Sequence, residues 1–465
     1  MIDRLPIDFT KRMKEYLGEE YDAFIASYEK PEIKGLRLNN EAPREFLGAV
    51  FSDGSSEEAI FSDIPWLKNG FSYTNDVVRP GKHPYHEAGV YYIQEPSAMA
   101  PAVYLDVKPG ERVLDLCAAP GGKSTQLGAM LEGKGILVSN EIMPDRAKIL
   151  SENIERMGIS NALVISEDPR NISDRFAGYF DKILVDAPCS GEGMFRRSDV
   201  AINEWSLDNV ATCADRQSWI LDEAAKMLRP GGTIVYSTCT FAKEEDEEQI
   251  KSFLERNNNF VLAEMELYGR MREGYDNIGV RIWPHLVEGE GHYVCKIHKK
   301  NYLEDNSTAK NPPVYGYETD LSKKDRESLK EMYEFFKKNI KDEDFLSNRR
   351  LTRFKDQIYM LPEECPSLKG MKVLRPGLHL GTILKNRFEP GHALARILGK
   401  DDVTNTCVLR ECDIETRKFL RGETFNVTGE NGWSLVLVDE YSMGWGKIAN
   451  GIMKNHYPKG LRKDV

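Results

Sequence analysis

The chain has 465 residues, of which 41% are hydrophobic and 10% aromatic, and its formal net charge is −11. This length predicts two to four domains, and the hydrophobic content excludes a wholly disordered chain. The first residues, MIDRLPIDFTKRMKEYLG, are polar and charged. No run approaches the roughly 18 to 20 apolar residues of a membrane helix. We therefore expect a soluble cytoplasmic protein with no membrane partner.

The negative charge argues mildly against a nucleic-acid partner. The sum is a weak test, because phosphate binding depends on local basic patches. Part of the excess lies in one acidic run, Glu244–Glu248 (EEDEE). The net charge therefore leaves room for an RNA-binding face elsewhere in the chain.

Eight cysteines are spread through the sequence, too few for a disulfide scaffold in so long a chain. The closest pair, Cys407 and Cys412, has four residues between its members and no second pair nearby. A structural zinc site needs four ligands at suitable spacing, so no metal is predicted. Reduced thiols in a cytoplasmic protein are the better interpretation.

In chain order, residues 1–94 have a helical start followed by turn signals, and we expect an α+β accessory domain that binds RNA. Residues 95–298 alternate apolar β runs with helical patterns such as Pro144–Met157 and Asn209–Leu228. Such alternation is typical of an α/β fold with a mostly parallel, doubly wound sheet. The five predicted strands are Arg112–Cys117, Ile136–Asn140, Ala162–Ile165, Lys182–Asp186 and Thr233–Thr238.

The C-terminal third begins with a polar stretch, and we expect a linker over 299–316. A helical pattern, Lys323–Ile340, and a basic segment, Asn348–Lys355, follow within an intermediate domain at 317–384. The last part has short β-like runs, such as Trp433–Val438, with many glycines and aromatic residues. It predicts a small β-rich domain at 385–465.

A glycine-rich loop, Asp115–Thr125 (DLCAAPGGKST), follows the first strand and opens a helix. Gly121 and Gly122 allow close backbone approach, and a helix start has free N–H groups. A plain structural turn is one interpretation. A P-loop is disfavoured, because Cys117 stands where its first glycine is required and Pro120 lacks an N–H.

A nucleoside cofactor is the other interpretation of this loop. Such a site requires an acid at the end of the second strand to hold ribose hydroxyls, and Glu141 lies there. Asp168 follows the third strand and is similarly placed for the adenine end. From spacing alone, a simple turn aspartate is nearly as good an explanation of Asp168.

Two cysteines follow the fourth and fifth strands, Cys189 after Asp186-Ala-Pro and Cys239 after Ser237-Thr. A single cysteine is usually a small buried apolar residue, but two at the ligand-binding edge suggest chemistry. A thiolate that adds to carbon 6 of cytosine makes carbon 5 nucleophilic, and a second group must later remove the carbon 5 proton. Asp186 is a candidate acid that neutralises charge on the ring. The residues alone do not say which cysteine attacks.

Three motifs, CAAPGGK at 117–123, DAPCSG at 186–191 and STCT at 237–240, resemble those of the Sun-type RNA cytosine-5 methyltransferases. The resemblance implies a class I Rossmann-like methyltransferase in which Cys239 attacks the base, Cys189 assists release, and S-adenosylmethionine becomes S-adenosylhomocysteine. DNA cytosine methyltransferases use one cysteine in a Pro-Cys-Gln context, so DNA is not an expected substrate. The implied cofactor-binding residues are Cys117, Ala118, Ala119, Pro120, Gly121, Gly122, Lys123, Glu141, Asp168 and Asp186.

Segments 281–293, 377–395 and 443–462 resemble the RsmF-type branch of this family. That resemblance implies a PUA-like RNA-binding module at the C-terminus and 16S rRNA in the 30S subunit as the partner. An assembled subunit fits an acidic enzyme better than naked RNA does. A tRNA or another rRNA substrate, and a non-catalytic ribosome-assembly factor, are the alternatives; the intact cysteine pair argues against the last.

Basic residues near the C-terminus could contact phosphates while Trp445 and Tyr457 stack on bases. Arg196 and Arg197, just past the catalytic loop, could meet the phosphates of the target strand. A solvated charged face explains each of these groups equally well. The C-terminal basic residues are Lys447, Lys454, His456, Lys459, Arg462 and Lys463.

Overall fold

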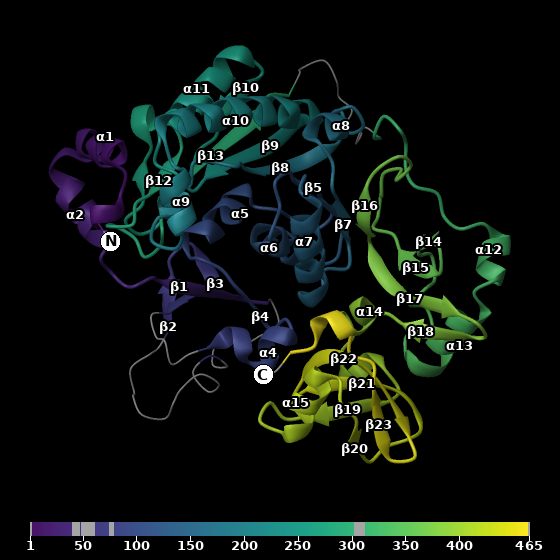
Figure 1. The fold of residues 1–465 in the computed structure, drawn as a ribbon. Coiled ribbons are helices and arrows are strands. Elements are labelled where there is room, and N and C mark those ends of the chain that lie inside the picture. The colour runs from purple at the N-terminus through teal and green to yellow at the C-terminus, as the bar shows by residue number, and fades with distance from the viewer. Residues whose placement is uncertain (1, 40–46, 48–60, 74–78, 302–311, 464–465) are drawn as a thin grey trace.

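The computed structural model describes residues 2–39, 47, 61–73, 79–301 and 312–463 (Figure 1). Residues 302–311 of the expected linker lie outside the described residues. A central mixed sheet forms the middle of the fold, and three smaller sheets lie beside it. No helix in the described ranges is long and apolar enough to cross a membrane.

The middle of the central sheet is parallel, with strand order β9-β8-β5-β6-β7. The observed strands closely match the predicted ones, so the predicted α/β class is confirmed. Antiparallel strands flank them: β13 (His292–Lys299), β12 (Val280–Ile282) and β11 (Arg272–Glu273) beside β9, with β10 (Phe260–Leu262) on β13. The parallel strands are β5 (Arg112–Asp115), β6 (Ile136–Asn140), β7 (Ala162–Ile165), β8 (Phe180–Asp186) and β9 (Leu228–Thr238).

Helices cover both faces of this sheet. Successive apolar residues along each strand point to opposite sides, so each face must be buried. Val113 packs in one hydrophobic cluster with α5 (Ala100–Leu105), α6 (Gly122–Met130) and α7 (Pro144–Arg156). Leu114 packs in the other with α8 (Pro169–Ser173), α10 (Leu207–Met227) and α11 (Glu247–Arg256). The strands are therefore apolar throughout, and for this reason they could be predicted from the sequence.

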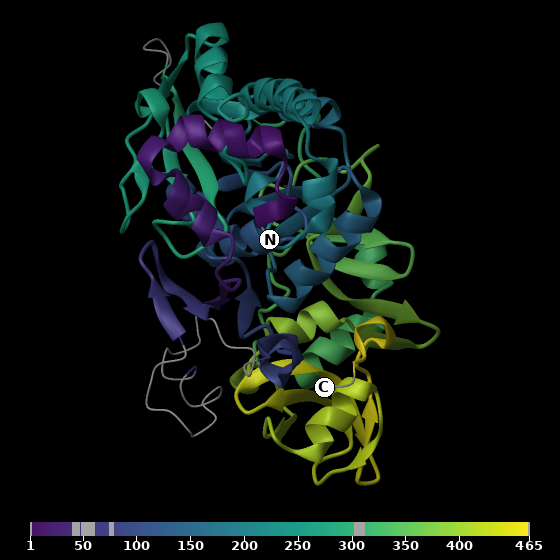
Figure 2. The ribbon, with the colours of Figure 1, turned by 60° about the vertical axis from the view of Figure 1, so that its left-hand side comes forward.

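The N-terminal region lies beside the catalytic edge of the sheet (Figures 1 and 2). Helices α1 (Ile7–Leu17) and α2 (Tyr21–Ser27) pack through Phe9, Met13 and Phe24 against Phe195 and Trp205, which follow β8. A four-stranded sheet follows, in the order β2-β3-β1-β4. Its strands are β1 (Lys34–Leu38), β2 (Phe61–Ile64), β3 (Leu67–Tyr73) and β4 (Tyr91–Ile93).

The C-terminal region contains helices α12 (Lys323–Glu327) and α13 (Lys330–Asn339) and two sheets. Strand β16 (Val373–Pro376) leaves this region and pairs antiparallel with β7, so it extends the central sheet. The first sheet contains β14 (Leu351–Phe354), β15 (Gln357–Met360), β17 (Leu378–Leu384) and β18 (Arg387–Pro390), which α14 (His392–Arg396) follows.

The last sheet has the order β19-β21-β22-β23-β20 and packs with the N-terminal sheet in one hydrophobic cluster. Its members include Leu36 and Tyr91 from the N-terminal sheet and Phe419 and Val436 from the C-terminal region. The N-terminal sheet and the last C-terminal sheet are therefore joined below the central sheet (Figure 1). The elements are β19 (Thr406–Leu409), α15 (Ile414–Arg421), β20 (Phe425–Asn426), β21 (Gly432–Val438), β22 (Tyr441–Ala449) and β23 (Ile452–Asn455).

Candidate active site

Two cysteines face each other at the carboxyl edge of the central sheet. Cys189 follows β8, Cys239 follows β9, and the register aligns Asp186 with Ser237 in these parallel neighbours. The two sulfur atoms lie 3.3 Å apart, and both cysteines are free and partly exposed. This is a hydrogen-bonding distance between thiols, so the structure brings the two predicted residues together.

The surroundings of the two sulfurs differ. The hydrogen bond with Cys239 and burial raise the pKa of Cys189 well above its ordinary value. Cys189 therefore keeps its proton and can donate it to the Cys239 sulfur. The thiolate is the nucleophilic form of a cysteine, so this high pKa makes Cys189 a poor nucleophile in the free protein.

Lys123 supplies positive charge beside this pair. Its Nζ lies 2.8 Å from Oδ2 of Asp186. Burial alone would lower the pKa of Lys123, but the neighbouring Asp186 carboxylate and Cys239 sulfur outweigh it and raise the pKa. An ammonium group within electrostatic reach stabilises a thiolate, so the electropositive setting required for Cys239 is present.

Asp186 is a carboxylate in the free protein. Burial alone would raise its pKa, but Lys123 and His292 lower it well below the ordinary range. The hydroxyl of Ser237 donates to Oδ1 at 2.8 Å, and Nε2 of His292 lies 3.6 Å from the same oxygen. In the free protein Asp186 is therefore a carboxylate paired with the ammonium group of Lys123.

The glycine-rich loop has the geometry of a ligand cradle. Gly121 is the N-cap of α6 with φ +114°, a conformation that favours glycine. A Cβ at Gly122 would lie 3.1 Å from Cδ of Gln94, so a side chain there would crowd the loop. Arg146 and Asn153 of α7 donate to the carbonyls of Ala119 and Pro120 at 3.0 and 2.9 Å. These bonds hold the loop against α7, and no side chain caps the start of α6.

Three acids follow the strands beside this loop. Glu141 is buried after β6, where it accepts the N–H of Met143 at 2.9 Å. Asp168 follows β7, but its carboxylate caps α8 by accepting the N–H of Arg170. Asp115, at the end of β5, was not among the predicted site residues. One of its oxygens accepts from Ser124 at 2.7 Å.

The other oxygen of Asp115 is buried and has no hydrogen-bond partner within the described part of the chain. An unsatisfied carboxylate oxygen, a nearby buried glutamate and the open start of α6 together offer acceptors and N–H donors. Ribose hydroxyls, an amino group and a carboxylate require such partners. These residues therefore fit S-adenosylmethionine.

The pH dependence of stability should report on Asp115. Burial raises its pKa to about 7. Because the folded pKa lies above the unfolded one, the associated stability is complete at low pH and is lost as the pH rises through 7. Asparagine cannot ionise, so we expect Asp115→Asn to avoid this loss of folding free energy, which amounts to up to ~4 kcal/mol. Thermal unfolding should show the variant gaining apparent Tm over the wild type between pH 4 and pH 8; a constant difference would contradict this.

Two expectations about RNA contacts are wrong. Arg196 does not face an RNA strand, because its side chain is only 5% exposed and pairs with Glu290 at 2.6 Å. Trp445 and Tyr457, each 2% exposed, belong to the C-terminal cores and cannot stack on bases. Arg197 is about one-third exposed and pairs with Glu32. Burial in the core of a small β domain therefore explains Trp445 and Tyr457 better than RNA recognition does.

The glycine-rich loop, the paired thiols and the doubly wound sheet define the class of this protein as a methyltransferase. Family models confirm this class along most of the chain. The description "16S rRNA methyltransferase RsmB/F" matches residues 102–298, and the N-terminal domain of RsmF matches 5–96. The first C-terminal domain of RsmF matches 334–398, and its PUA domain matches 412–463. The chain belongs to the RsmB/F family and is an RNA methyltransferase.

Similar proteins extend over nearly the full length. A protein of Vibrio cholerae named ribosomal RNA small subunit methyltransferase F is 28% identical, over 99% of this chain and 98% of that one. The protein of the same name from Shewanella oneidensis is 29% identical, over 95% and 94%. The structure of a methyltransferase homologue from Pyrococcus horikoshii is 30% identical with a TM-score of 0.55, over 63% of this chain and 94% of that one.

A structure of NSun6 from Pyrococcus horikoshii with SFG has a TM-score of 0.56 at 22% identity. It covers 65% of this chain and 100% of that one. This likeness is evidence for the fold alone.

Proposed function

We propose that this protein methylates carbon 5 of cytosine in 16S rRNA, with S-adenosylmethionine as the methyl donor. The observation that carries the proposal is the pair of thiols 3.3 Å apart, one of which keeps its proton. Two neighbouring thiols suit a reaction that needs a nucleophile and later a base. The names of the full-length relatives support the choice of small-subunit rRNA.

In the proposed mechanism, the Cys239 thiolate forms a bond from its sulfur to carbon 6 of the cytosine. The electrons of the carbon 5–carbon 6 double bond move into the ring, so carbon 5 becomes enamine-like. The ammonium group of Lys123, held by Asp186, neutralises the negative charge that develops on the ring. Asp186 thus acts by holding Lys123 rather than by donating a proton.

The residues proposed to hold the cofactor surround the start of α6 and the ends of β6, β7 and β8. When bound, S-adenosylmethionine supplies a methyl group on a sulfonium and leaves as S-adenosylhomocysteine. Asp115 and Glu141 are placed to accept hydrogen bonds from it. The full proposed set is Asp115, Cys117, Ala118, Ala119, Pro120, Gly121, Gly122, Lys123, Glu141, Asp168 and Asp186.

Release requires a base at carbon 5, and we assign it to Cys189. Once Cys239 is bonded to carbon 6, it no longer has the charge and the hydrogen bond that raised the pKa of Cys189. The partly exposed Cys189 thiol can then lose its proton to solvent water, and the resulting thiolate removes the carbon 5 proton. The electron pair of that carbon–hydrogen bond restores the double bond and expels Cys239 as a thiolate.

We infer that residues 1–94 and 385–465, which flank the 95–298 catalytic domain in the sequence, bind RNA. Residues 299–316 are the linker, and residues 317–384 form an intermediate domain. The PUA match supports the C-terminal assignment. Exposed lysines there, Lys447, Lys454 and Lys459, could contact phosphates. The net charge of −11 favours the assembled 30S subunit as substrate. A thiol-dependent reaction on ribosomal RNA also supports a cytoplasmic location.

The test uses the purified full-length protein and S-adenosylmethionine with a labelled methyl group. Small subunits from a strain that lacks the gene should accept label, and bisulfite sequencing should identify the cytosine. Naked 16S rRNA should be a poorer acceptor, and tRNA should take up no label. Labelling of tRNA in preference to the subunit would overturn the proposed substrate, and label on another base would overturn the proposed reaction.

A further inference from the structure

The loops that carry the two cysteines are joined by a reciprocal pair of buried carboxylates. Glu192, three residues after Cys189, accepts the backbone N–H of Phe241 in the Cys239 loop at 2.8 Å. Glu245, six residues after Cys239, accepts the backbone N–H of Ser190 in the Cys189 loop at 2.9 Å. Each loop therefore holds the other through a carboxylate.

Two further contacts join the same two loops. The N–H of Gly193 donates to the carbonyl of Cys239 at 2.8 Å, and the hydroxyls of Ser190 and Thr240 lie 2.8 Å apart. Both carboxylates are fully buried. A buried carboxylate is costly to desolvate, so a structure that keeps two of them beside the thiols uses their charge-assisted hydrogen bonds.

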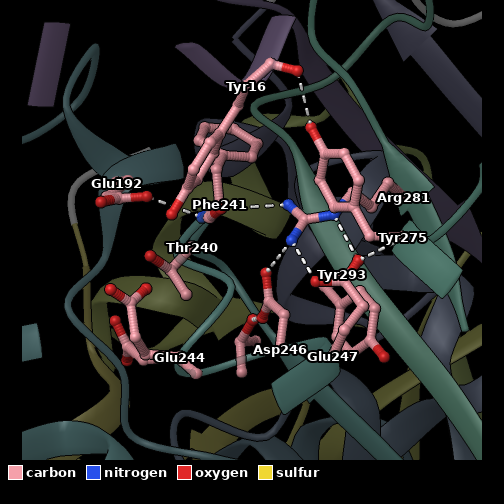
Figure 3. Close-up of polar contacts among 12 residues, drawn as sticks. Tyr16, Glu192, Thr240, Phe241, Glu244, Asp246, Glu247, Tyr275, Arg281 and Tyr293 are labelled. Carbon is pink, nitrogen blue, oxygen red and sulfur yellow. Dashed lines mark hydrogen bonds and ion pairs between the residues drawn. The ribbon is translucent and has the colours of Figure 1, made fainter. Parts of the chain in front are cut away.

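Two arginines pair with Glu192 and with the acids next to Glu245 in the sequence. Arg12 of α1 lies 3.9 Å from Glu192 and 2.5 Å from Glu244. Arg281 of β12 is buried and pairs with Asp246 at 3.1 Å and with Glu247 at 2.5 Å (Figure 3). Glu245, Asp246 and Glu247 are thus buried within this acidic run, whereas Glu248 is exposed.

We propose that Glu192 and Glu245 are positioning residues that set the distance and orientation of the Cys239 and Cys189 sulfurs. This inference rests on the proposed function of the two thiols. The carboxylates touch neither substrate nor cofactor; they act through the backbone of the cysteine loops. Displacing a reacting group by about 1 Å can cost on the order of a hundredfold in rate, so such support matters for catalysis.

The two glutamates differ in a way that makes the proposal testable. Both donors to Glu245, the N–H of Ser190 and Nε2 of Gln217, point at the same oxygen, and the other oxygen has no partner within the described residues. Glutamine can replace Glu245 without losing either bond. Glu192 uses both oxygens, one for Phe241 and one for Trp205, so glutamine there must lose one.

We therefore expect a particular order of activities. Glu245→Ala and Glu192→Ala should lower kcat by about 10- to 100-fold and leave KM for RNA within about twofold. Glu245→Gln should recover most of the loss, to within about fivefold of wild type, whereas Glu192→Gln should recover less. Glu248→Ala removes an exposed carboxylate of the same run and serves as the matched control.

A second measurement follows the sulfurs without methyl transfer. Diamide accepts two electrons and two protons as the Cys189 and Cys239 thiols form a disulfide. Mass spectrometry should show this disulfide forming about tenfold more slowly in both alanine variants and at the wild-type rate in Glu248→Ala. This readout remains valid even if the protein methylates no RNA, so its failure is separate from that of the proposed function.

Apparent Tm values distinguish positioning from loss of fold. Wild-type kcat and wild-type disulfide rates in the folded alanine variants would overturn the proposal. If those variants do not fold, the glutamine pair decides the question. Glu192→Gln with the same kcat and disulfide rate as Glu245→Gln would overturn it, and a selective defect in Glu192→Gln would support it.

Discussion

Replacing Cys239 with alanine is expected to lower the rate of methyl transfer by at least about 10⁴-fold. Without a thiolate, carbon 5 of the cytosine is not made nucleophilic, and burial raises the pKa of the neighbouring Cys189, which makes it a poor replacement. The cofactor loop and the RNA-binding surfaces lie on other segments, so binding of S-adenosylmethionine and RNA should persist. Single-turnover transfer of labelled methyl, with calorimetry for the cofactor, measures both.

Cys412→Ala is the matched control, because it removes an exposed thiol that lies outside the catalytic region. It should transfer methyl groups at the wild-type rate. If Cys239→Ala were to retain more than about a tenth of the wild-type rate, Cys239 could not be the nucleophile, since removing a nucleophile costs far more than that.

Cys189→Ala is expected to trap the enzyme on ordinary RNA. Attack by Cys239 does not need Cys189, but the carbon 5 proton then has no base to remove it, and the Cys239–carbon 6 bond persists. Turnover should fall by on the order of 10² to 10⁴, the usual contribution of a general base. A complex of protein and labelled RNA that survives denaturing electrophoresis is the expected signal.

The double variant Cys189→Ala with Cys239→Ala should give no such complex, which shows that the trapped bond is to Cys239. A Cys189→Ala enzyme that turns over at the wild-type rate, without any stable complex, would remove Cys189 from the mechanism. Another group would then have to remove the carbon 5 proton.

Much of the fold could be predicted from the sequence because the parallel strands are buried on both faces and appear as unbroken apolar runs. Cys189 and Cys239 could be placed together because parallel neighbours end at one edge. The order of the two thiols could not be derived from the residues. The raised pKa of Cys189 depends on its hydrogen bond with Cys239 and on its burial, and only the structure shows these two features.

The features that sequence reasoning missed depend on contacts between distant segments. Glu245 and Glu247 resemble surface acids in the sequence, but Gln217 and Arg281 pair with them from other elements. In the sequence Arg196 is a candidate phosphate contact, but in the structure it pairs with Glu290, which lies far along the chain. Asp115 could have been found, because an acid at the end of the first strand precedes the glycine-rich loop.

The most direct test of covalent catalysis by Cys239 is a trap with RNA that carries 5-fluorocytosine at the target position. Fluorine at carbon 5 cannot be removed as a proton, so the bond between sulfur and carbon 6 should persist after methyl transfer. Proteolysis and mass spectrometry of the complex should place the nucleotide on Cys239. A nucleotide on Cys189, or methylation of RNA that never gives a covalent complex, would contradict the mechanism.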